Sequence, residues 1–164
     1  MLHVGLAPDT VAVNAMMDVA GKAQRWSTAV CVLRQMSAQG PSPDVISYNT
    51  AISSCEAGQR WDWALRLLVE MREDDVQPDV VSYSAAILVC ASGRMWEHAL
   101  RLVEEMLARS LRANVIALTG LLGAYERSLN WERALRLLYG MRARGPEPDV
   151  HAYSATVSAC ARSH

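Results

Sequence analysis

The side chains best suited to chemistry in this sequence are its cysteines and histidines, and their spacing limits what they can do. A zinc site needs ligands a few residues apart, as in a C-x-x-C pair, and no such pair occurs. Cys55, Cys90 and Cys160 instead share one position of a regular repeat, where Ala20 and Tyr125 stand in other copies. A position that accepts such different apolar sizes is a packing position. The sequence therefore predicts that the cysteines are buried structural thiols, which are typical of a reducing compartment.

The histidines form no catalytic or metal-binding constellation. They share neither a repeat position nor a ligand spacing, and they are His3, His98, His151 and His164. We expect His98 to lie on a solvated helix face. The sequence thus predicts a protein that is not an enzyme, with no catalytic residue, no metal site and no cofactor.

Carboxylates recur directly after proline at a fixed interval. The pairs are Pro8-Asp9, Pro43-Asp44, Pro78-Asp79 and Pro148-Asp149. Proline cannot continue a helix, and an aspartate can accept the first free backbone N–H groups of the helix that follows. Each pair therefore predicts that one helix ends and the next begins.

The same interval of 35 residues runs through the whole chain of 164 residues without insertion or deletion. Methionine recurs at Met1, Met36, Met71, Met106 and Met141, and tryptophan recurs at Trp26, Trp61, Trp96 and Trp131. A fixed period in this range indicates a solenoid, whose units bury their apolar faces against their neighbours. The period divides the chain into the end of a preceding unit at 1–9, full units at 10–44, 45–79, 80–114 and 115–149, and a partial unit at 150–164.

Each unit carries two segments with helical spacing, separated by a polar break such as Gly58-Gln59-Arg60. In the second unit the two apolar series at i, i+3, i+4 and i+7 are Tyr48, Ala51, Ile52 and Cys55, then Trp61, Ala64, Leu65 and Leu68. A small residue recurs in the second segment, at Ala29, Ala64, Ala99 and Ala134, and allows two helices to approach closely. The tryptophan is predicted to be buried and to fill volume at the turn of each hairpin. The sequence therefore predicts an all-α solenoid of stacked helical hairpins.

The composition excludes some partners and weakens others. The net charge is -1, so no global positive field attracts nucleic acid, although 15 of the 16 basic residues are arginine and only Lys22 is lysine. No stretch reaches the roughly 18 to 20 apolar residues of a membrane span, so no membrane partner is expected. The N-terminal segment has the features of neither a signal peptide nor a transit peptide.

The unit from Val45 to Asp79 resembles a pentatricopeptide repeat of the pure 35-residue class. The matching features are Val45-Ile46-Ser47-Tyr48-Asn49-Thr50, Trp61, Ala64-Leu65, Met71 and Gln77-Pro78-Asp79, and the resemblance extends over essentially the whole chain. It implies a right-handed superhelix of the pentatricopeptide and tetratricopeptide kind that binds single-stranded RNA and reads one base per repeat. It also implies a role in organellar RNA processing, stability, editing or translation, in a chloroplast or mitochondrion, with the plastid preferred.

The resemblance implies which residues contact each base. The fifth and last residues of a unit would read the base together: Asn14 with Asp44, Asn49 with Asp79, Ser84 with Asn114, and Thr119 with Asp149. The second residue of each unit would sandwich the bases, at Val11, Ile46, Val81, Ile116 and His151. Taken one by one, the last residues are also explained as helix caps, and aspartate can cap and read at once.

Hydrogen-bond chemistry and the rules of the family predict the same base for each unit. Uracil and guanine present an N–H donor at the centre of their pairing edge, which Asp44, Asp79 or Asp149 can accept. Adenine and cytosine present an acceptor there, which suits the amide of Asn114. A short hydroxyl at the fifth position leaves room for a purine, whereas asparagine suits a pyrimidine. The predicted sequence is U-U-A-G, read from 5′ to 3′ along the chain.

Phosphate contacts are expected from one further position, and here the chain departs from the family. The end of the first helix carries Lys22, Arg127 and Arg162 but also Ala57 and Ser92, with Glu56 and Glu126 beside this row, so the grip on RNA should be weak. A second basic row, at Arg66, Arg101 and Arg136, is predicted to form solvated i,i+4 pairs with Glu70 and Glu105. Another protein on this convex face is the alternative.

Three other classes of protein fit these residues less well. A cytidine-deaminase-like domain would need H-x-E and C-x-x-C, which do not occur, and a nuclease would need clustered aspartates, whereas the Pro-Asp aspartates here lie one per unit. A tetratricopeptide-like scaffold that binds protein on the concave face is the alternative function, but its units have about 34 residues and carry their tryptophan in the first helix. We expect further units beyond both ends or end-to-end stacking, with Tyr153, Val157 and Cys160 half covered.

Overall fold

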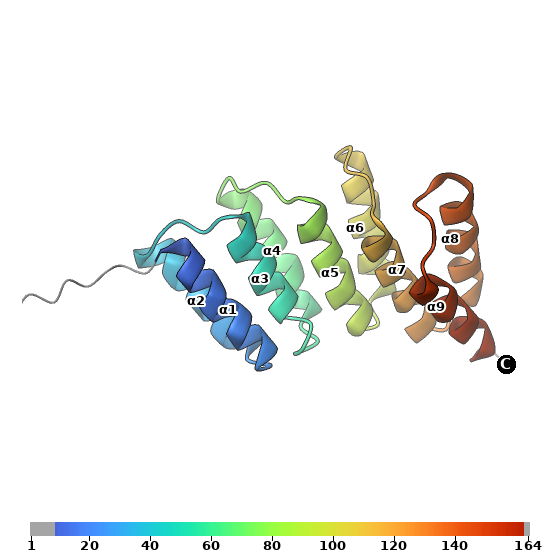
Figure 1. Cartoon of the computed structure of the whole chain (residues 1–164), viewed down its shortest axis with the longest axis horizontal. Coiled ribbons are helices and arrows are strands. Elements are labelled where there is room, and N and C mark those ends of the chain that lie inside the picture. Colours follow the sequence, from blue (N-terminus) through green and yellow to red (C-terminus); the bar gives the residue numbers. More distant parts are fainter. Residues whose placement is uncertain (1–8, 163–164) are drawn as a thin grey trace, which may run out of the picture.

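The computed structural model describes residues 9–162, and within this range it contains nine helices and no strand (Figure 1). The helices are α1 (Thr10–Lys22), α2 (Trp26–Gln39), α3 (Val45–Ser54), α4 (Trp61–Glu73), α5 (Val80–Ser92), α6 (Trp96–Ala108), α7 (Val115–Arg127), α8 (Trp131–Arg144) and α9 (Val150–Ala161). Each full unit expected from the period contains one pair of helices, and the partial unit contains α9. The expected unit end at 1–9 lies outside the described residues, apart from Asp9.

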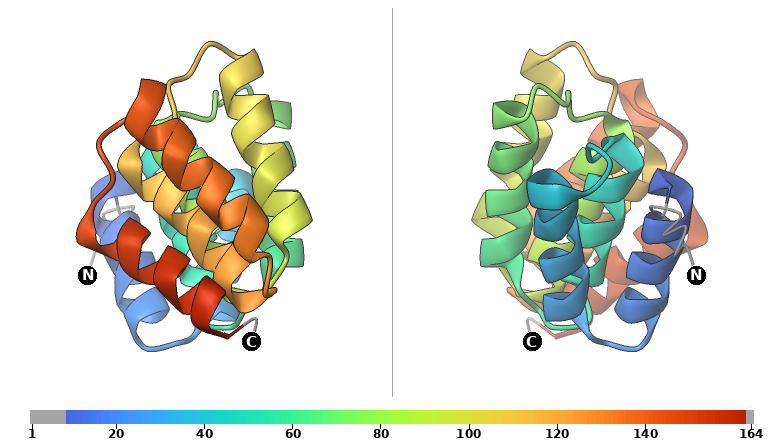
Figure 2. Two further views of the ribbon diagram at one scale, coloured as in Figure 1. Left: turned by 90° about the vertical axis from the view of Figure 1, so that its right-hand side faces the viewer. Right: turned by 90° about the vertical axis from the view of Figure 1, so that its left-hand side faces the viewer.

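The helices form two layers along one axis. The odd-numbered helices α1, α3, α5, α7 and α9 pack side by side, each against the next. Each even-numbered helix packs against the first helix of its own pair and against the first helix of the following pair (Figures 1 and 2). This stacking confirms the predicted all-α solenoid. The odd-numbered helices therefore present one continuous face.

The side chains before the odd-numbered helices cap them as predicted. The side-chain oxygens of Asp9, Asp44, Asp79, Asn114 and Asp149 each accept the backbone N–H three residues on, at 2.8 Å. In α3 and α5 a serine hydroxyl also accepts the backbone N–H of the capping aspartate, which completes a capping box. The helix starts read from Pro-Asp are thus confirmed, and they fix the position of each capping carboxylate.

The turn inside each hairpin is the same in all four full units. Gln24, Gln59, Arg94 and Leu129 adopt positive φ angles of 59°, 51°, 59° and 59°. The following residue closes the end of the helix with a hydrogen bond to the carbonyl five residues back, as from Arg60 N to Cys55 O at 3.0 Å. The cysteine position therefore lies at the end of the first helix, in the packed layer.

The repeated alanines and tyrosines form the core. Ala29, Ala64, Ala99 and Ala134 are fully buried, which confirms the predicted close approach of helices. Tyr48 and Tyr83 are buried as well, and each hydroxyl reaches a carboxylate: Asp74 Oδ2 at 2.5 Å and Glu105 Oε1 at 3.0 Å. Burial, followed by the neighbouring carboxylates, raises the pKa of both tyrosines, so they stay neutral donors at physiological pH.

The prediction of buried tryptophans was wrong. Trp26, Trp61 and Trp96 are half-buried, and Trp131 is 41% exposed. The rings lie against the hairpin turn of the following unit, where Trp26 covers Gly58 and Trp61 covers Gly93. The tryptophan therefore joins two units across the solenoid surface and does not fill the interior of its own hairpin.

The cysteines correspond only in part to the prediction of buried thiols. Cys55 and Cys90 are buried, and burial raises the pKa of both thiols to about 12, so they are protonated at neutral pH. Cys160 is half-buried and Cys31 is exposed on α2. Cys31 does not share the repeat position of the others, which is why the packing argument does not extend to it.

The expected pairs of Arg66 with Glu70 and of Arg101 with Glu105 are replaced by other ion pairs, two of which join neighbouring units. Glu70 pairs with Arg34 of the preceding unit at 2.8 Å, and Glu105 pairs with Arg72 at 2.5 Å and with Arg109 at 3.3 Å. Arg66 lies over the ring of Trp63, with its guanidinium carbon 5.1 Å from the ring centroid. The carboxylates are thus used by arginines outside the predicted row.

His98 is only partly solvated, whereas the sequence predicted a solvated helix face. Its ring lies 4.9 Å from that of Trp61, centroid to centroid, and its Nδ1 is buried without a hydrogen-bond partner in the described part of the chain.

At the C-terminal side of the stack, Tyr153 is 43% exposed and Val157 is 67% exposed. No helix within residues 9–162 is long and apolar enough to cross a membrane.

Candidate nucleic-acid interface

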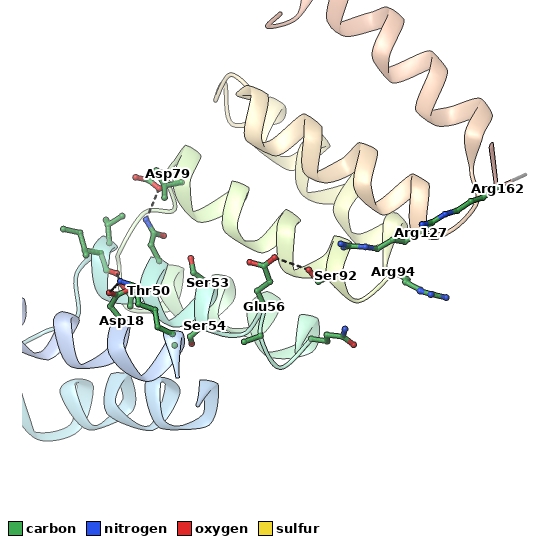
Figure 3. A pocket seen from close by; sticks show the side chains of 18 residues that line it. Asp18, Thr50, Ser53, Ser54, Glu56, Asp79, Ser92, Arg94, Arg127 and Arg162 are labelled. Carbon is green, nitrogen blue, oxygen red and sulfur yellow. Dashed lines mark hydrogen bonds and ion pairs between the residues drawn. The ribbon is translucent and has the colours of Figure 1, made fainter. Parts of the chain in front are cut away.

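A groove of about 1090 Å³ lies on the face formed by the odd-numbered helices. Its lining includes the predicted readers Asn49 and Asp79 and the predicted walls Ile46 and Val81. Figure 3 shows Asp79, Asp18 and Thr50 toward one end of the groove and Arg94, Arg127 and Arg162 toward the other. Residues predicted for base reading and for phosphate contact therefore line one continuous surface.

The structure brings together both members of every predicted pair, although they lie 30 residues apart in sequence. Asn14 Nδ2 donates to Asp44 Oδ1 at 3.3 Å, and Asn49 Nδ2 donates to Asp79 Oδ1 at 3.4 Å. Hydroxyls replace the amide in the later units. Ser84 Oγ lies 3.1 Å from Asn114 Oδ1 and also donates to Val80 O at 2.6 Å, and Thr119 donates to Asp149 Oδ1 at 3.3 Å. Four side-chain pairs of one geometry thus recur along the face.

One oxygen serves both the helix cap and the pair. In every pair, Oδ1 of the last residue accepts the capping N–H and also accepts from the fifth residue of the unit. The second polar atom of the side chain is Oδ2, an acceptor, in Asp44, Asp79 and Asp149, and it is Nδ2, a donor, in Asn114. The polar atom that the cap does not use is therefore an acceptor in three of the pairs and a donor in the pair that contains Asn114.

The electrostatics keep two of these carboxylates ionised. Partial burial opposes the charged form of Asp44 and Asp79, but hydrogen bonds from a serine backbone N–H, the serine hydroxyl and an asparagine amide outweigh it and lower the pKa of both. Since this pKa is lower in the folded chain than in the unfolded chain, both groups stabilise the fold above pH about 4. Their contribution is lost as the pH falls through the lowered pKa.

The predicted base-sandwiching side chains are open to solvent. Val11, Ile46, Val81 and Ile116 are 75%, 62%, 56% and 55% exposed, and His151 is exposed as well. Single exposed apolar side chains are common on protein surfaces, but these recur at one repeat position along one face. They stand one helical turn or less from the reading pairs, because the second and fifth residues of a unit are three apart.

The predicted phosphate row is only partly free. Lys22 pairs with Asp18 at 2.6 Å, and Arg162 lies 3.7 Å from Glu126. Glu56 enters the groove and accepts a hydrogen bond from Ser92 Oγ at 3.2 Å (Figure 3). Of the two carboxylates expected beside this row, Glu56 therefore lines the groove, and Glu126 lies beside Arg162.

Arg94 is a groove residue that the sequence reasoning missed. It stands at the positive-φ position of the turn between α5 and α6, two residues beyond Ser92 of the predicted phosphate row. The equivalent residues are Gln24, Gln59 and Leu129, so no repeated basic position marks the site. A search for the nearest basic side chain in each unit would have found it.

Nothing in residues 9–162 points to a metal centre, because no group of three or more histidine, cysteine or acidic side chains is placed to hold an ion. What the described residues do contain is a helical-repeat surface with paired polar side chains at a constant spacing. The class of protein defined by this fold is a solenoid of helical hairpins with a groove along its first helices.

Sequence comparison narrows that class to one family. A model described as the PPR repeat family matches residues 8–56 and 43–92, the pentatricopeptide repeat domain matches 101–162, and the PPR repeat matches 81–111. The first of these alone spans more than half of the chain. The chain belongs to the pentatricopeptide repeat family. No curated protein sequence matches it significantly.

Solved structures of the same family are similar over nearly the whole chain. The crystal structure of the maize pentatricopeptide repeat protein PPR10 in complex with an 18-nt psaJ RNA element matches with 27% identity and a TM-score of 0.85, over 99% of this chain and 24% of PPR10. PPR10 from maize in a second crystal structure matches with 26% identity and a TM-score of 0.80, over 94% of this chain and 22% of PPR10. The chain thus spans about a quarter of the length of these relatives.

A more distant neighbour shares the fold alone. The PPR domain of Arabidopsis thaliana protein-only RNase P 1, in complex with tRNA, is 14% identical with a TM-score of 0.76, over 93% of this chain and 81% of that domain. The agreement across such different sequences reflects the common packing of helical hairpins.

Proposed function

We propose that this protein binds single-stranded RNA along the face of its odd-numbered helices and that each full unit selects one base. The observation that carries the proposal is the recurrence of four hydrogen-bonded side-chain pairs at one repeat position, each with one polar atom left over from the cap. A solvent-exposed branched side chain stands beside each pair. Purely structural caps would not need a partner from the first helix of the same unit.

The proposed preference is U-U-A-G from 5′ to 3′. An ionised carboxylate oxygen at Asp44, Asp79 and Asp149 accepts the N–H of uracil or guanine and repels adenine and cytosine. Asn114 offers an amide donor in the same place, which suits adenine. Asn14 and Asn49 are longer than Ser84 and Thr119 and leave less room, so the first two units take the smaller uracil.

One comparison supports RNA as the partner. PPR10 was crystallised with RNA, and it is 27% identical to this chain over 99% of the length of this chain. Because the chain spans only 24% of PPR10, the activity of a whole protein that contains these units is a proposal too. We place that activity in organellar RNA metabolism, in a chloroplast or mitochondrion.

A gel-shift or fluorescence anisotropy titration tests the proposal directly. We expect labelled single-stranded RNA with UUAG to bind more tightly than RNA with UAAG, which differs at the second base alone, and the double change Asn49→Ala with Asp79→Ala to abolish this difference. The double change Asn14→Ala with Asp44→Ala is the matched control, because it removes a pair of the same geometry in the first unit and should leave the difference at the second base intact. Equal affinity for the two RNAs, or a selectivity that survives the double change, would contradict base reading and favour a protein-binding scaffold.

Glu56 should weaken RNA binding, so its neutralisation should strengthen it. The carboxylate lies in the groove among Arg94, Arg127 and Arg162, where it repels phosphates. We expect Glu56→Gln to raise the affinity for UUAG RNA about three- to tenfold at low salt and less at high salt, because salt screens the repulsion. Glu104→Gln, on the exposed side of α6, is the control. The same change in both variants would show that only net charge matters.

A further inference from the structure

The third residue of the second and third units is a serine that is completely buried, at Ser47 and Ser82. The Ser47 hydroxyl lies 2.7 Å from Asn14 Oδ1 and 2.8 Å from Asp44 Oδ1, and it accepts the backbone N–H of Asp44 at 3.2 Å. One hydroxyl therefore contacts both members of the first reading pair. Because Ser47 has no exposed surface, it can act on a bound base only through Asn14 and Asp44.

The contacts of Asn14 favour one orientation of its amide. Its Oδ1 receives the Ser47 hydroxyl, and its Nδ2 donates to Asp44 Oδ1. Turned by 180°, the amide would place its carbonyl against the Asp44 carboxylate, where two acceptors repel each other. Asn14 is 8% exposed, so its carbonyl needs a protein donor. The one hydrogen of the Ser47 hydroxyl lies between Asn14 Oδ1 and Asp44 Oδ1, at 2.7 Å and 2.8 Å from the hydroxyl oxygen, so the two acceptors share it.

This orientation bears on the choice between two pyrimidines. The Asn14 nitrogen carries two hydrogens, of which one goes to Asp44, so the second is a donor for the base. Uracil has carbonyl oxygens on both sides of its N–H and can accept that hydrogen. Cytosine has an amino group on one side, which would need the amide oxygen instead. An amide that can turn in either direction would not separate the two bases.

The serine occurs in this chain only next to asparagine readers. Ser47 and Ser82 follow Asn14 and Asn49, whereas Ala117 and Ala152 follow the hydroxyl readers Ser84 and Thr119. A hydroxyl reader brings no carbonyl that needs a donor, and it donates directly to the last residue of its unit.

The second unit holds the network in a weaker form. Ser82 Oγ contacts Asp79 Oδ1 at 3.0 Å, while Asn49 Oδ1 is buried and no donor within residues 9–162 reaches it. The amide of Asn49 is therefore held by one contact, where that of Asn14 is held by two. The selectivity of the second base should be correspondingly lower than that of the first.

We infer that Ser47, and in weaker form Ser82, is a positioning residue that makes the asparagine and aspartate pair of the preceding unit select uracil over cytosine. The inference rests on the proposed function. It extends the recognition unit from two side chains to three and assigns a role to a residue that touches no RNA.

The test compares RNA that carries UUAG with RNA that carries CUAG. We expect Ser47→Ala to lower the preference for uracil at the first base about tenfold, since a buried carbonyl loses its donor. The preference for adenine over guanine at the third base should stay unchanged, and Ser47→Thr should retain the wild-type preference. Ser82→Ala should produce a smaller loss, confined to the second base.

A gain-of-function pair of variants keeps the test independent of the α3 cap. Thr119→Asn installs an asparagine reader where the third residue of the next unit is Ala152, and we expect it to take pyrimidines with little choice between uracil and cytosine. Addition of Ala152→Ser should restore the preference for uracil at that base.

The outcomes are distinct. If the wild-type protein does not prefer UUAG, the proposed function fails and the inference fails with it. If the wild type prefers uracil and both Ser47→Ala and the Ala152→Ser addition leave the uracil to cytosine ratio unchanged, the inference is overturned while the proposed function stands. An equal loss of selectivity at all four bases would assign Ser47 to stability alone and would also overturn it.

Discussion

The change Asn114→Asp is expected to convert the third unit from a reader of adenine to a reader of guanine. In the wild type, Asn114 Oδ1 caps α7 and pairs with Ser84, and Nδ2 is the remaining donor. Aspartate retains the capping oxygen and replaces that donor by an acceptor. The affinity for UUAG should fall about tenfold and that for UUGG should rise about tenfold, since each hydrogen bond matched to a base edge contributes about 1–3 kcal/mol. Competition titrations with the two RNAs measure both changes.

The reverse change, Asp149→Asn, is the matched control in the fourth unit. It should move the fourth base from guanine to adenine and leave the third base unaffected. Both substitutions keep the volume of the side chain and the geometry of the cap. Neither should therefore change the free energy of unfolding by more than a few tenths of a kcal/mol. An Asn114→Asp protein that still binds UUAG more tightly than UUGG would refute the reading role of this position.

Contacts within one helix or one unit were well predicted from the sequence. The Pro-Asp pairs, the repeated alanines and the two apolar series depend on spacings along a single helix, and the caps and buried positions agree with them. Contacts between units were not. Glu70 lies four residues from Arg66 in α4, yet it pairs with Arg34 in the neighbouring unit, because the offset between two stacked units cannot be read from the spacing within one.

The candidate site shows the same difference between contacts within one unit and contacts between units. The fifth and last residues of each unit were assigned by resemblance to the family, and the structure places them 3.1–3.4 Å apart. Their reading role stays a prediction. Ser47 was overlooked, because in sequence it is an ordinary residue of the first helical turn after an N-cap. Only the contact with Asn14, 33 residues earlier, distinguishes it from a capping serine.

Replacement of Gly58 by alanine is expected to destabilise the stack. A Cβ atom built on Gly58 lies 2.4 Å from Cδ1 and 2.6 Å from Nε1 of Trp26, so the indole of the preceding unit would have to move. That ring also lies 4.7 Å from the Arg60 guanidinium and 6.1 Å from the Trp63 ring, which restrict its escape. We expect Gly58→Ala to lower the free energy of unfolding by about 1–3 kcal/mol, the usual cost of overpacking. Urea denaturation followed by tryptophan fluorescence measures it.

Alanine in place of two other glycines should have the opposite effect on the free energy of unfolding. A Cβ on Gly123 in α7 or on Gly140 in α8 meets nothing within 4 Å, so alanine there should raise the free energy of unfolding by about 0.5–1 kcal/mol through helix propensity. In a Trp26→Leu background, most of the cost of Gly58→Ala should disappear, because the atoms that it would meet are gone. A cost that persists without the indole would place the effect in the turn itself. The sign of the same substitution thus separates packing between units from the propensity of a single helix, which is the distinction that the repeat period alone does not make.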